Sequence, residues 1–333
     1  MSTAQDPWQT TRPHLVMPSS SVRTALHEGQ LRLSYQPIVD LYTGKPRGVE
    51  ALLRWEHPVL GTIGPDAFLS SIAHTPLMHE ITDWVLRTAL QALTAWPDWT
   101  VSINVSAHDV SRPQLVDQVE SALAAAGIAP ERLVLELTEQ AMVESLSAAL
   151  TVLGVLRERG VGLSLDDFGT GFSSLLYLRD LPITELKIDG GFVSRTPDSN
   201  DDLAIVSSVA ALGRSLGLTV VAEGVENFGH VLVARAVGCS AAQGFLWGAP
   251  AAREDIDPTV VHELPPARAE REPLPAALTR EGVRTRELLA SGASPHTIAA
   301  ALNSEGLRTP RQTRWTAITV ASVIAELSET AEP

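Results

Sequence analysis

The sequence predicts an α/β protein, a TIM-like (β/α)8 barrel that is followed by a small all-α unit at the C-terminal end. Short apolar runs typical of strands alternate with longer amphipathic runs typical of helices throughout residues 20–250. Several of the strand-like runs also end on carboxylate, amide or basic side chains. The carboxyl ends of barrel strands are where enzymes of this architecture keep their chemistry.

The barrel elements are expected in alternating order. Eight apolar runs bounded by turn residues predict strands, at residues 32–39, 46–52, 100–105, 132–137, 161–166, 184–188, 218–222 and 240–245. Apolar residues at three- and four-residue spacing between these runs predict helices, for example at residues 78–95, 113–126, 140–159 and 201–216. Eight strands separated by helices give the base plan of a β/α barrel.

The regions outside the barrel differ from it in composition. Residues 1–19 are polar, contain Pro and Ser, and are expected to form a mobile tail. Residues 251–276 are rich in Pro, Glu, Arg and Ala, which is typical of an extended linker. The last unit, residues 277–330, has helical patterns and no strand signal, with helices expected at residues 278–291, 295–303 and 316–327.

The charge balance bears on the substrate class. The chain has 333 residues and a formal charge of −14 at pH 7. Uncompensated negative charge would repel an anionic substrate, whereas bound divalent cations would reverse the sign locally. The only lysines are Lys45 and Lys187, so Lys187 within the apolar run ELKID is conspicuous as a compact charge or proton donor.

We expect a cytoplasmic protein without a membrane span. No apolar stretch reaches the roughly 20 residues that cross a bilayer. The first residues lack the cationic start and apolar run of a secretory signal. The single cysteine, Cys239, excludes an intramolecular disulfide and suits a reducing compartment.

Oxygen ligands gather at the ends of the predicted strands. They belong to Glu50, Asn104, Glu136, Glu139, Asp166, Asp167 and Glu223. Magnesium and manganese prefer oxygen ligands, and a two-metal site needs several carboxylates, of which at least one bridges both ions. Because consecutive strand residues point to opposite faces, Asp166 and Asp167 can share a site only where the chain turns, and Gly169 and Gly171 can supply that turn.

Over residues 20–250 the sequence resembles the EAL domains, bacterial phosphodiesterases that linearise cyclic di-GMP. The resemblance is carried by an ordered set of motifs, namely YQPIVDL from Tyr35, EALLRW from Glu50, SINVS around Asn104, ELTE from Glu136, DDFGTG from Asp166, KID from Lys187, AEGVE around Glu223 and QGF from Gln243. It implies a barrel whose first strand runs antiparallel to the others.

The resemblance also implies a chemistry, the hydrolysis of cyclic di-GMP to linear pGpG with two Mg²⁺ or Mn²⁺ ions. It implies that one ion is held by Glu50, Asn104, Glu136 and Asp166, and the other by Asp166, Asp167 and Glu223. Lys187 would hold the attacking water or the phosphate oxygens, and Glu223 would also serve as general base. Together with Glu50, these two residues would form the catalytic set.

Further roles are implied for the surroundings of the metals. Arg54 would hold the substrate phosphate, Gln36 a guanine, and Gln243 the metal-bound water network. Glu139 would steady the loop from Phe168 to Ser174. That loop and the helix after it are the usual dimer contact of the family, so a homodimer is expected.

Two positions depart from the family pattern and leave a second interpretation open. Many members carry Asp where this chain has Ser240, and Tyr where it has Phe245. Neither position is an implied metal ligand, but the resemblance implies that a change at either would alter guanine stacking or affinity. A cyclic di-GMP receptor that signals through the C-terminal unit without turnover is therefore the alternative to the enzyme. An enolase-like barrel also uses acids and a lysine, but it explains Asn104 and Arg54 less well.

The C-terminal segment resembles the helical region that follows the catalytic domain in large serine recombinases. Ser294 and Pro295 are typical of a helix start, and Gly306 of its end. Three arginines, Arg308, Arg311 and Arg314, lie between this helix and the next and are candidates for contact with DNA phosphates. A small packing or dimerisation unit with a solvated basic loop explains the same residues.

Overall fold

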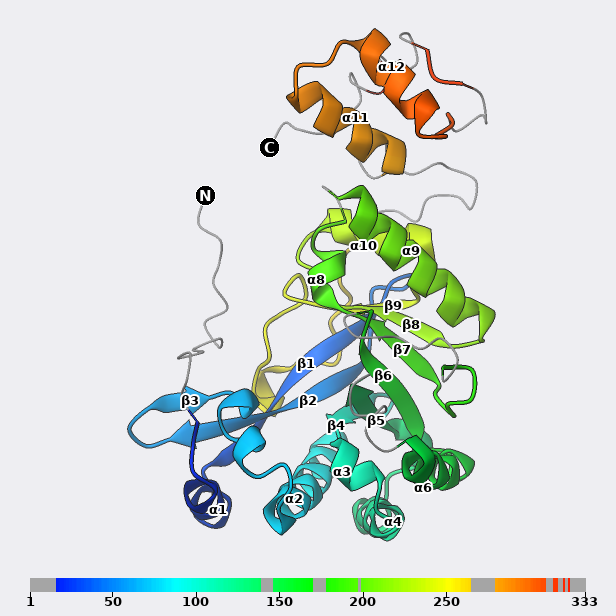
Figure 1. Ribbon diagram of the computed structural model, residues 1–333. Coiled ribbons are helices and arrows are strands. Elements are labelled where there is room, and N and C mark those ends of the chain that lie inside the picture. Colours follow the sequence, from blue (N-terminus) through cyan, green and yellow to red (C-terminus); the bar gives the residue numbers. More distant parts are fainter. Residues whose placement is uncertain are drawn as a thin grey trace. The chain divides into compact units, whose positions relative to one another are not determined.

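The computed structural model describes residues 16–138, 146–169, 178–196, 199–264, 279–309 and 314–316, together with Val320 and Val323 (Figure 1). Within these ranges the chain divides into two compact units. The first comprises residues 16–40, 45–187 and 247–261, and the second comprises residues 41–44, 188–246 and the part from His262 onward.

Nine strands form one sheet in the order β1-β9-β8-β7-β6-β5-β4-β2-β3, and β1 also pairs with β2. Their bounds are Leu31–Asp40 (β1), Pro46–His57 (β2), Gly61–Ile63 (β3), Thr100–Asn104 (β4), Leu133–Thr138 (β5), Gly162–Phe168 (β6), Glu185–Ile188 (β7), Thr219–Ala222 (β8) and Ala241–Gln243 (β9). The pairing of β1 with β2 closes eight strands into a barrel and leaves β3 as an extra strand. The predicted barrel is therefore confirmed.

The first strand is antiparallel to its neighbour, as the resemblance implied. β1 pairs antiparallel with β2, whereas β2, β4, β5 and β6 pair in parallel. β3 was not predicted, because its three residues are too short for a periodic signal. It pairs with the end of β2, from Trp55↔Ile63 to His57↔Gly61, which explains why β2 runs five residues past its predicted end at residue 52.

Helices of the first unit follow one another along the outer side of its strands (Figure 1). They are α1 (Ser19–His27), α2 (Pro76–Leu93), α4 (Gln114–Ala126) and α6 (Leu146–Glu158), with the short α3 (Ala107–Val110) and the 3-10 turns η1 (Pro65–Ala67), η2 (Leu69–Ser71), η3 (Pro130–Arg132) and η4 (Arg253–Asp255). α2 packs against β4 and α4, and α6 packs against β6. Pro76 opens α2 at its first turn, and Gly127 ends α4 with φ of 66°.

The second unit contains α8 (Gly190–Val193), α9 (Asn200–Ser215), α10 (Phe228–Val237), α11 (Arg280–Ala290) and α12 (Pro295–Ser304). Side-chain caps begin α9 and α10, where Ser199 accepts from the backbone N–H of Asp202 and Asn227 from that of His230. Ser294 caps α12 with Pro295 at its first turn, as the sequence indicated. Most of the predicted helix at residues 316–327 lies outside the described residues.

A small separate core holds the C-terminal helices together. It is built from Ile298, Ala299, Leu302, Leu307, Trp315 and Val320. The side chain of Asn303 bonds the backbone of Trp315 twice, with Nδ2 donating to its carbonyl at 2.8 Å and Oδ1 accepting from its N–H at 2.9 Å. These contacts fix α12 against the chain around Trp315. No described helix of the chain is both long and apolar enough to cross a bilayer.

Residues 251–264 begin the predicted linker, yet they are hydrogen-bonded to β1 and to the turn between β1 and β2. Tyr35 and Ala251 exchange two backbone bonds, of 2.7 and 3.0 Å. The N–H of His262 donates to the carbonyl of Gly44 at 2.8 Å. Gly44 has φ of 71°, and a Cβ there would lie 2.2 Å from the His262 carbonyl oxygen, so this approach requires glycine.

A chain that ends after Pro250 should unfold roughly 6–12 °C lower than one that ends after Leu264, because it loses three backbone hydrogen bonds of roughly 1 kcal/mol each. Thermal unfolding followed by circular dichroism measures the difference. Equal melting temperatures for the two truncations would show that residues 251–264 add nothing to the barrel.

Candidate active site

A lysine surrounded by carboxylates lies at the centre of the candidate site. The Nζ atom of Lys187 is 3.0 Å from Glu136, 3.3 Å from Glu50 and 3.5 Å from Asp166. These side chains come from β7, β5, β2 and β6, respectively. Lys187 and Glu136 are completely buried, and Glu50 is 6% exposed. The structure thus brings together four of the residues that the sequence singled out.

The parallel register of the strands explains this convergence. Asn104 on β4 lies opposite Glu136 on β5, and Thr138 on β5 lies opposite Asp166 on β6. The amide nitrogen of Asn104 donates to Glu50 at 2.8 Å, so the side-chain oxygen of Asn104 is the atom that can contact a metal ion. Asn104, the metal ligand predicted on β4, is therefore connected to the cluster through Glu50.

The adjacent acids Asp166 and Asp167 share the end of β6. Asp167 has φ of 55°, the only positive φ of a described residue other than glycine. This left-handed conformation costs of the order of 1 kcal/mol, but aspartate tolerates it better than most residues. It changes the chain direction within β6, and one carboxylate oxygen of each residue lies within 4.8 Å of the other. Of the two glycines expected to supply the turn, Gly169 has φ of 102°, and Gly171 lies outside the described residues.

The cluster contains more negative than positive charge. Burial is the largest cause that raises the pKa of Glu136 well above its usual value. The negative charge of Glu50 raises this pKa further, and the positive charge of Lys187 opposes the rise. Burial also raises the pKa of Asp166, again against Lys187. Three carboxylates thus share one buried ammonium. An excess of buried negative charge demands protons or a further cation.

The residues fit a divalent metal. Oε1 of Glu136 is buried and has no hydrogen-bond partner in the described part of the chain, which is rare for a buried acceptor. The ammonium of Lys187 already lies where a cation contacts several carboxylates. All the donors are oxygen atoms, the kind that Mg²⁺ and Mn²⁺ prefer.

Glu185 is a buried acid that the sequence analysis did not single out. It lies two residues before Lys187, and residues two apart on a strand share a face. Burial raises the pKa of its carboxyl group, while Arg47, at 3.7 Å, and Lys187 oppose the rise. The strand period alone could have flagged it as a neighbour of Lys187 inside the barrel.

The implied substrate residues of the first unit lie on β1 and β2. Gln36 is opposite Glu50 in the antiparallel register and is buried, with its amide nitrogen 3.2 Å from the carbonyl of Gly248. Arg54 is four residues beyond Glu50 on the same face of β2 and is partly exposed. Glu139 lies outside the described residues, as does most of the loop from Phe168 to Ser174.

The remaining two predicted residues belong to the second unit. Glu223 follows β8 directly and is half-buried, and its N–H donates to the carbonyl of Ile188 at 3.1 Å. A Cβ on the next residue, Gly224, would lie 2.7 Å from the Cα of Gly190, so two glycines allow this backbone approach. Gln243 ends β9 and is buried, and its carbonyl accepts from the N–H of Val225.

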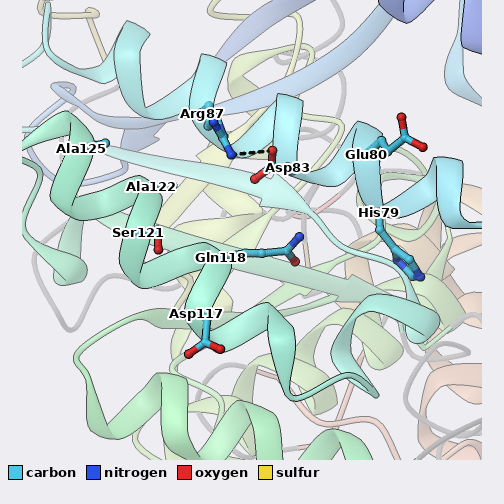
Figure 2. Close-up of a pocket in the computed structure, with 9 residues that line it drawn as sticks. All are labelled: His79, Glu80, Asp83, Arg87, Asp117, Gln118, Ser121, Ala122 and Ala125. Carbon is cyan, nitrogen blue, oxygen red and sulfur yellow. Dashed lines mark ion pairs between the residues drawn. The ribbon is translucent and has the colours of Figure 1, made fainter.

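A groove of about 600 Å³ lies elsewhere, between α2 and α4 (Figure 2). Its lining includes His79, Asp83, Arg87 and Asp117, none of which lies on a barrel strand. Asp83 is paired with Arg87 at 3.0 Å. The groove therefore does not compete with the strand-end cluster as the catalytic centre.

Comparisons with known proteins agree on one family. Residues 19–250 match the model of the EAL domain. The chain is 45% identical over 240 residues to the bifunctional diguanylate cyclase/cyclic di-GMP phosphodiesterase MucR of Pseudomonas aeruginosa, which covers 71% of this chain and 35% of MucR. It is 41% identical over 234 residues to the cyclic di-GMP phosphodiesterase NbdA of the same organism, which covers 69% of this chain and 30% of NbdA. The chain thus spans about a third of the length of these relatives.

Solved structures give the same result. The phosphodiesterase part of MucR in complex with c-di-GMP superimposes with a TM-score of 0.67 at 45% identity, covering 71% of this chain and 97% of that one. The EAL domain of Mycobacterium smegmatis DcpA gives 0.58 at 33% identity, covering 68% and 94%.

The buried carboxyl of Glu185 predicts a pH dependence of stability. Because this pKa is raised, the folded state keeps a proton on Glu185 that the unfolded state releases above about pH 4.3. The contribution of Glu185 to stability therefore falls as the pH rises from about 4.3 through the raised pKa. In metal-free protein, the melting temperature of Glu185→Gln minus that of the wild type should therefore increase with pH. A difference that stays constant between about pH 4.5 and 8 would contradict this.

Proposed function

The chain belongs to the EAL domain family, and from this premise we propose that it is a phosphodiesterase that hydrolyses cyclic di-GMP to pGpG with a water activated by two divalent cations. The observation that carries the proposal is the buried cluster of Glu50, Glu136 and Asp166 around Lys187. Similarity to a phosphodiesterase solved in complex with c-di-GMP supports the choice of substrate.

We assign one ion to Glu50, Asn104, Glu136 and Asp166, and the second to Asp166, Asp167 and Glu223. Divalent cations held there would lower the pKa of a bound water and stabilise the charge that develops on the phosphodiester oxygens. Asp166 would contribute to both sites in this assignment. The proposed cation is Mg²⁺ or Mn²⁺, since both take this set of oxygen donors.

The chain's own groups have distinct tasks in the proposed reaction. Lys187 donates hydrogen bonds from a position fixed by three carboxylates, so its charge is preorganised for a phosphate oxygen or the attacking water. Glu223 accepts the proton of that water. Arg54 clamps the phosphate, Gln36 holds a guanine, and Gln243 supports the water network.

A catalytically weak cyclic di-GMP receptor is the alternative. It is favoured by Ser240 and Phe245, which replace the Asp and Tyr of many family members. Phe245 is 43% exposed, so its ring is accessible to a planar ligand. The complete set of oxygen ligands favours the enzyme, because a receptor needs no activated water.

Hydrolysis should require an added divalent cation and the charge of Asp166. Asp166→Asn is expected to lower kcat by roughly two orders of magnitude or more, as for the loss of a preorganised charge at the reacting centre. Asp117→Asn, an exposed acid on α4, is the matched control and should retain full activity. Chromatography of the products of cyclic di-GMP incubated with Mg²⁺ or Mn²⁺ gives the rates.

Three outcomes separate the two candidate functions. Formation of pGpG that stops on chelation supports the enzyme. Tight binding of cyclic di-GMP by the wild type without product supports the receptor. Full turnover by metal-stripped protein, or by Asp166→Asn, would contradict the two-metal assignment.

The other partners remain predictions. The homodimer was expected through the loop and helix after Asp167, most of which lie outside the described residues. The cytoplasm is still the expected compartment, because a single cysteine, the buried Cys239, suits a reducing environment. Of the three arginines expected to contact DNA, Arg308 and Arg314 are described and Arg311 is not.

DNA contact by the C-terminal unit can be tested by its dependence on salt. If Arg314 contacts a phosphate, Arg314→Ala should reduce the slope of log affinity against log salt concentration by about 1, measured by fluorescence anisotropy with duplex DNA. Arg284→Ala is the control and should leave the slope unchanged, because Glu287 and Glu305 already pair that guanidinium. No retention of DNA at low salt would favour a packing or dimerisation unit.

A further inference from the structure

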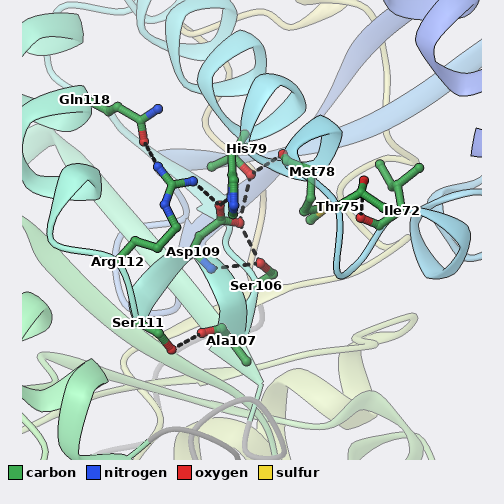
Figure 3. Close-up of polar contacts among 11 residues, drawn as sticks. Ile72, Thr75, Met78, His79, Ser106, Ala107, Asp109, Ser111, Arg112 and Gln118 are labelled. Atoms are coloured by element: carbon green, nitrogen blue, oxygen red, sulfur yellow. Dashed lines mark hydrogen bonds and ion pairs between the residues drawn. The ribbon is translucent and has the colours of Figure 1, made fainter.

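A second buried carboxylate, Asp109, lies outside the proposed catalytic cluster. It is on α3, directly after β4, and only 1% of its surface is exposed. Figure 3 shows the side chains of His79, Ser106 and Arg112 around it. Oδ1 lies 2.8 Å from Nδ1 of His79, and Oδ2 accepts from the hydroxyls of Thr82, at 2.9 Å, and Ser106, at 2.6 Å.

These contacts tie the turn after β4 to helix α2. His79 and Thr82 are one turn apart on α2. Ser106 and Asp109 bond each other in both directions at the start of α3, because the N–H of Asp109 also donates to the hydroxyl of Ser106. The guanidinium of Arg112 adds a more distant charge, at 3.9 Å. A buried carboxylate with this many donors holds its surroundings in one arrangement, because leaving any donor or the charge unpaired is costly.

A second contact, on the face of its ring, holds His79 in place. It stacks on His108 with ring centroids 5.5 Å apart and planes inclined by 3°. His79 also lies at one end of the groove between α2 and α4 (Figure 2). Its side chain is 20% exposed, so solvent reaches the network at this edge.

The anchored turn carries a proposed metal ligand. Asn104 lies two residues before Ser106, and its amide reaches Glu50 at 2.8 Å. Between them, the N–H of Val105 donates to the carbonyl of Glu136 at 2.9 Å. The short segment from Asn104 to Asp109 is therefore held at one end by the ligand cluster and at the other by α2.

We propose that Asp109 is a positioning residue for the metal site, which holds the turn after β4 against His79 and Thr82 and thereby fixes the amide oxygen of Asn104 toward the metal. This inference rests on the proposed function insofar as the cluster binds a divalent cation. Outer residues that orient metal ligands typically contribute roughly 10–100-fold to metal affinity or activity.

The test compares the two ends of β4 in the full-length chain. Asp109→Ala releases the end that carries Asn104. Arg132→Met is the matched control, because the Arg132 guanidinium bonds the carbonyls of Leu93, Trp96 and Trp99 just before the start of β4, at the opposite end of the strand. Both variants remove side-chain hydrogen bonds at an end of β4, but only the first lies next to a proposed ligand.

Affinity for Mn²⁺ is measured by calorimetry on chelator-stripped protein without nucleotide, and kcat and KM with cyclic di-GMP are measured at increasing Mn²⁺. Asp109→Ala should weaken Mn²⁺ binding by roughly 10–100-fold, lower kcat at limiting metal and leave KM within about twofold. Arg132→Met should lower the melting temperature and leave Mn²⁺ affinity within about twofold.

A milder variant keeps the inference testable if Asp109→Ala does not fold. Thr82→Val keeps the shape of the side chain, removes a single hydroxyl donor to Asp109, and should weaken Mn²⁺ binding several-fold. Unchanged Mn²⁺ affinity in Asp109→Ala or Thr82→Val, or an equal loss in Arg132→Met, would overturn the positioning role. Wild-type protein that binds Mn²⁺ without hydrolysing cyclic di-GMP would refute the proposed function alone, since the affinity comparison would still decide the inference.

Discussion

The ammonium of Lys187 among the carboxylates of Glu50, Glu136 and Asp166 is the interaction on which the site depends. A single positive charge here holds together acids from three other strands. Separately, each acid would be costly to bury, and even together they leave an excess of negative charge. The barrel therefore maintains a site that favours further cations, and it does so in a protein whose overall charge of −14 would otherwise repel a phosphodiester.

The scaffold supports this cluster through backbone features near the strand ends. Asp167 adopts a left-handed conformation, which directs two consecutive acids to one site. Gly190 and Gly224 approach so closely that a side chain on either would separate the backbone near Glu223. Such strain and close packing are tolerated because the surrounding strands and helices bury a large apolar core. Constrained backbone positions thus lie beside the residues with proposed chemistry, although Gly44, in the turn after β1, is constrained as well.

The fold was largely predictable because its signals are local. Eight strands and the main helices followed from apolar periodicity, and the caps of α12 followed from Ser294 and Pro295. β3 was missed because three residues carry no period, and it exists only because the end of β2 offers a partner. The hydrogen bonds of Ala251 and His262 were hidden by a Pro-rich composition that is typical of a linker. In both cases a distant segment decided the structure.

The sequence by itself determined which residues could serve as ligands and that they would gather on one face, because strand ends and chain order are encoded locally. Only the tertiary structure decided how those residues are paired. Lys187 lies 137 positions from Glu50 along the chain, and Asp109 lies 30 from His79. No local pattern specifies such contacts, since they depend on the register of neighbouring strands and on the packing of helices against them. The excess of buried charge that favours a metal arises from that packing.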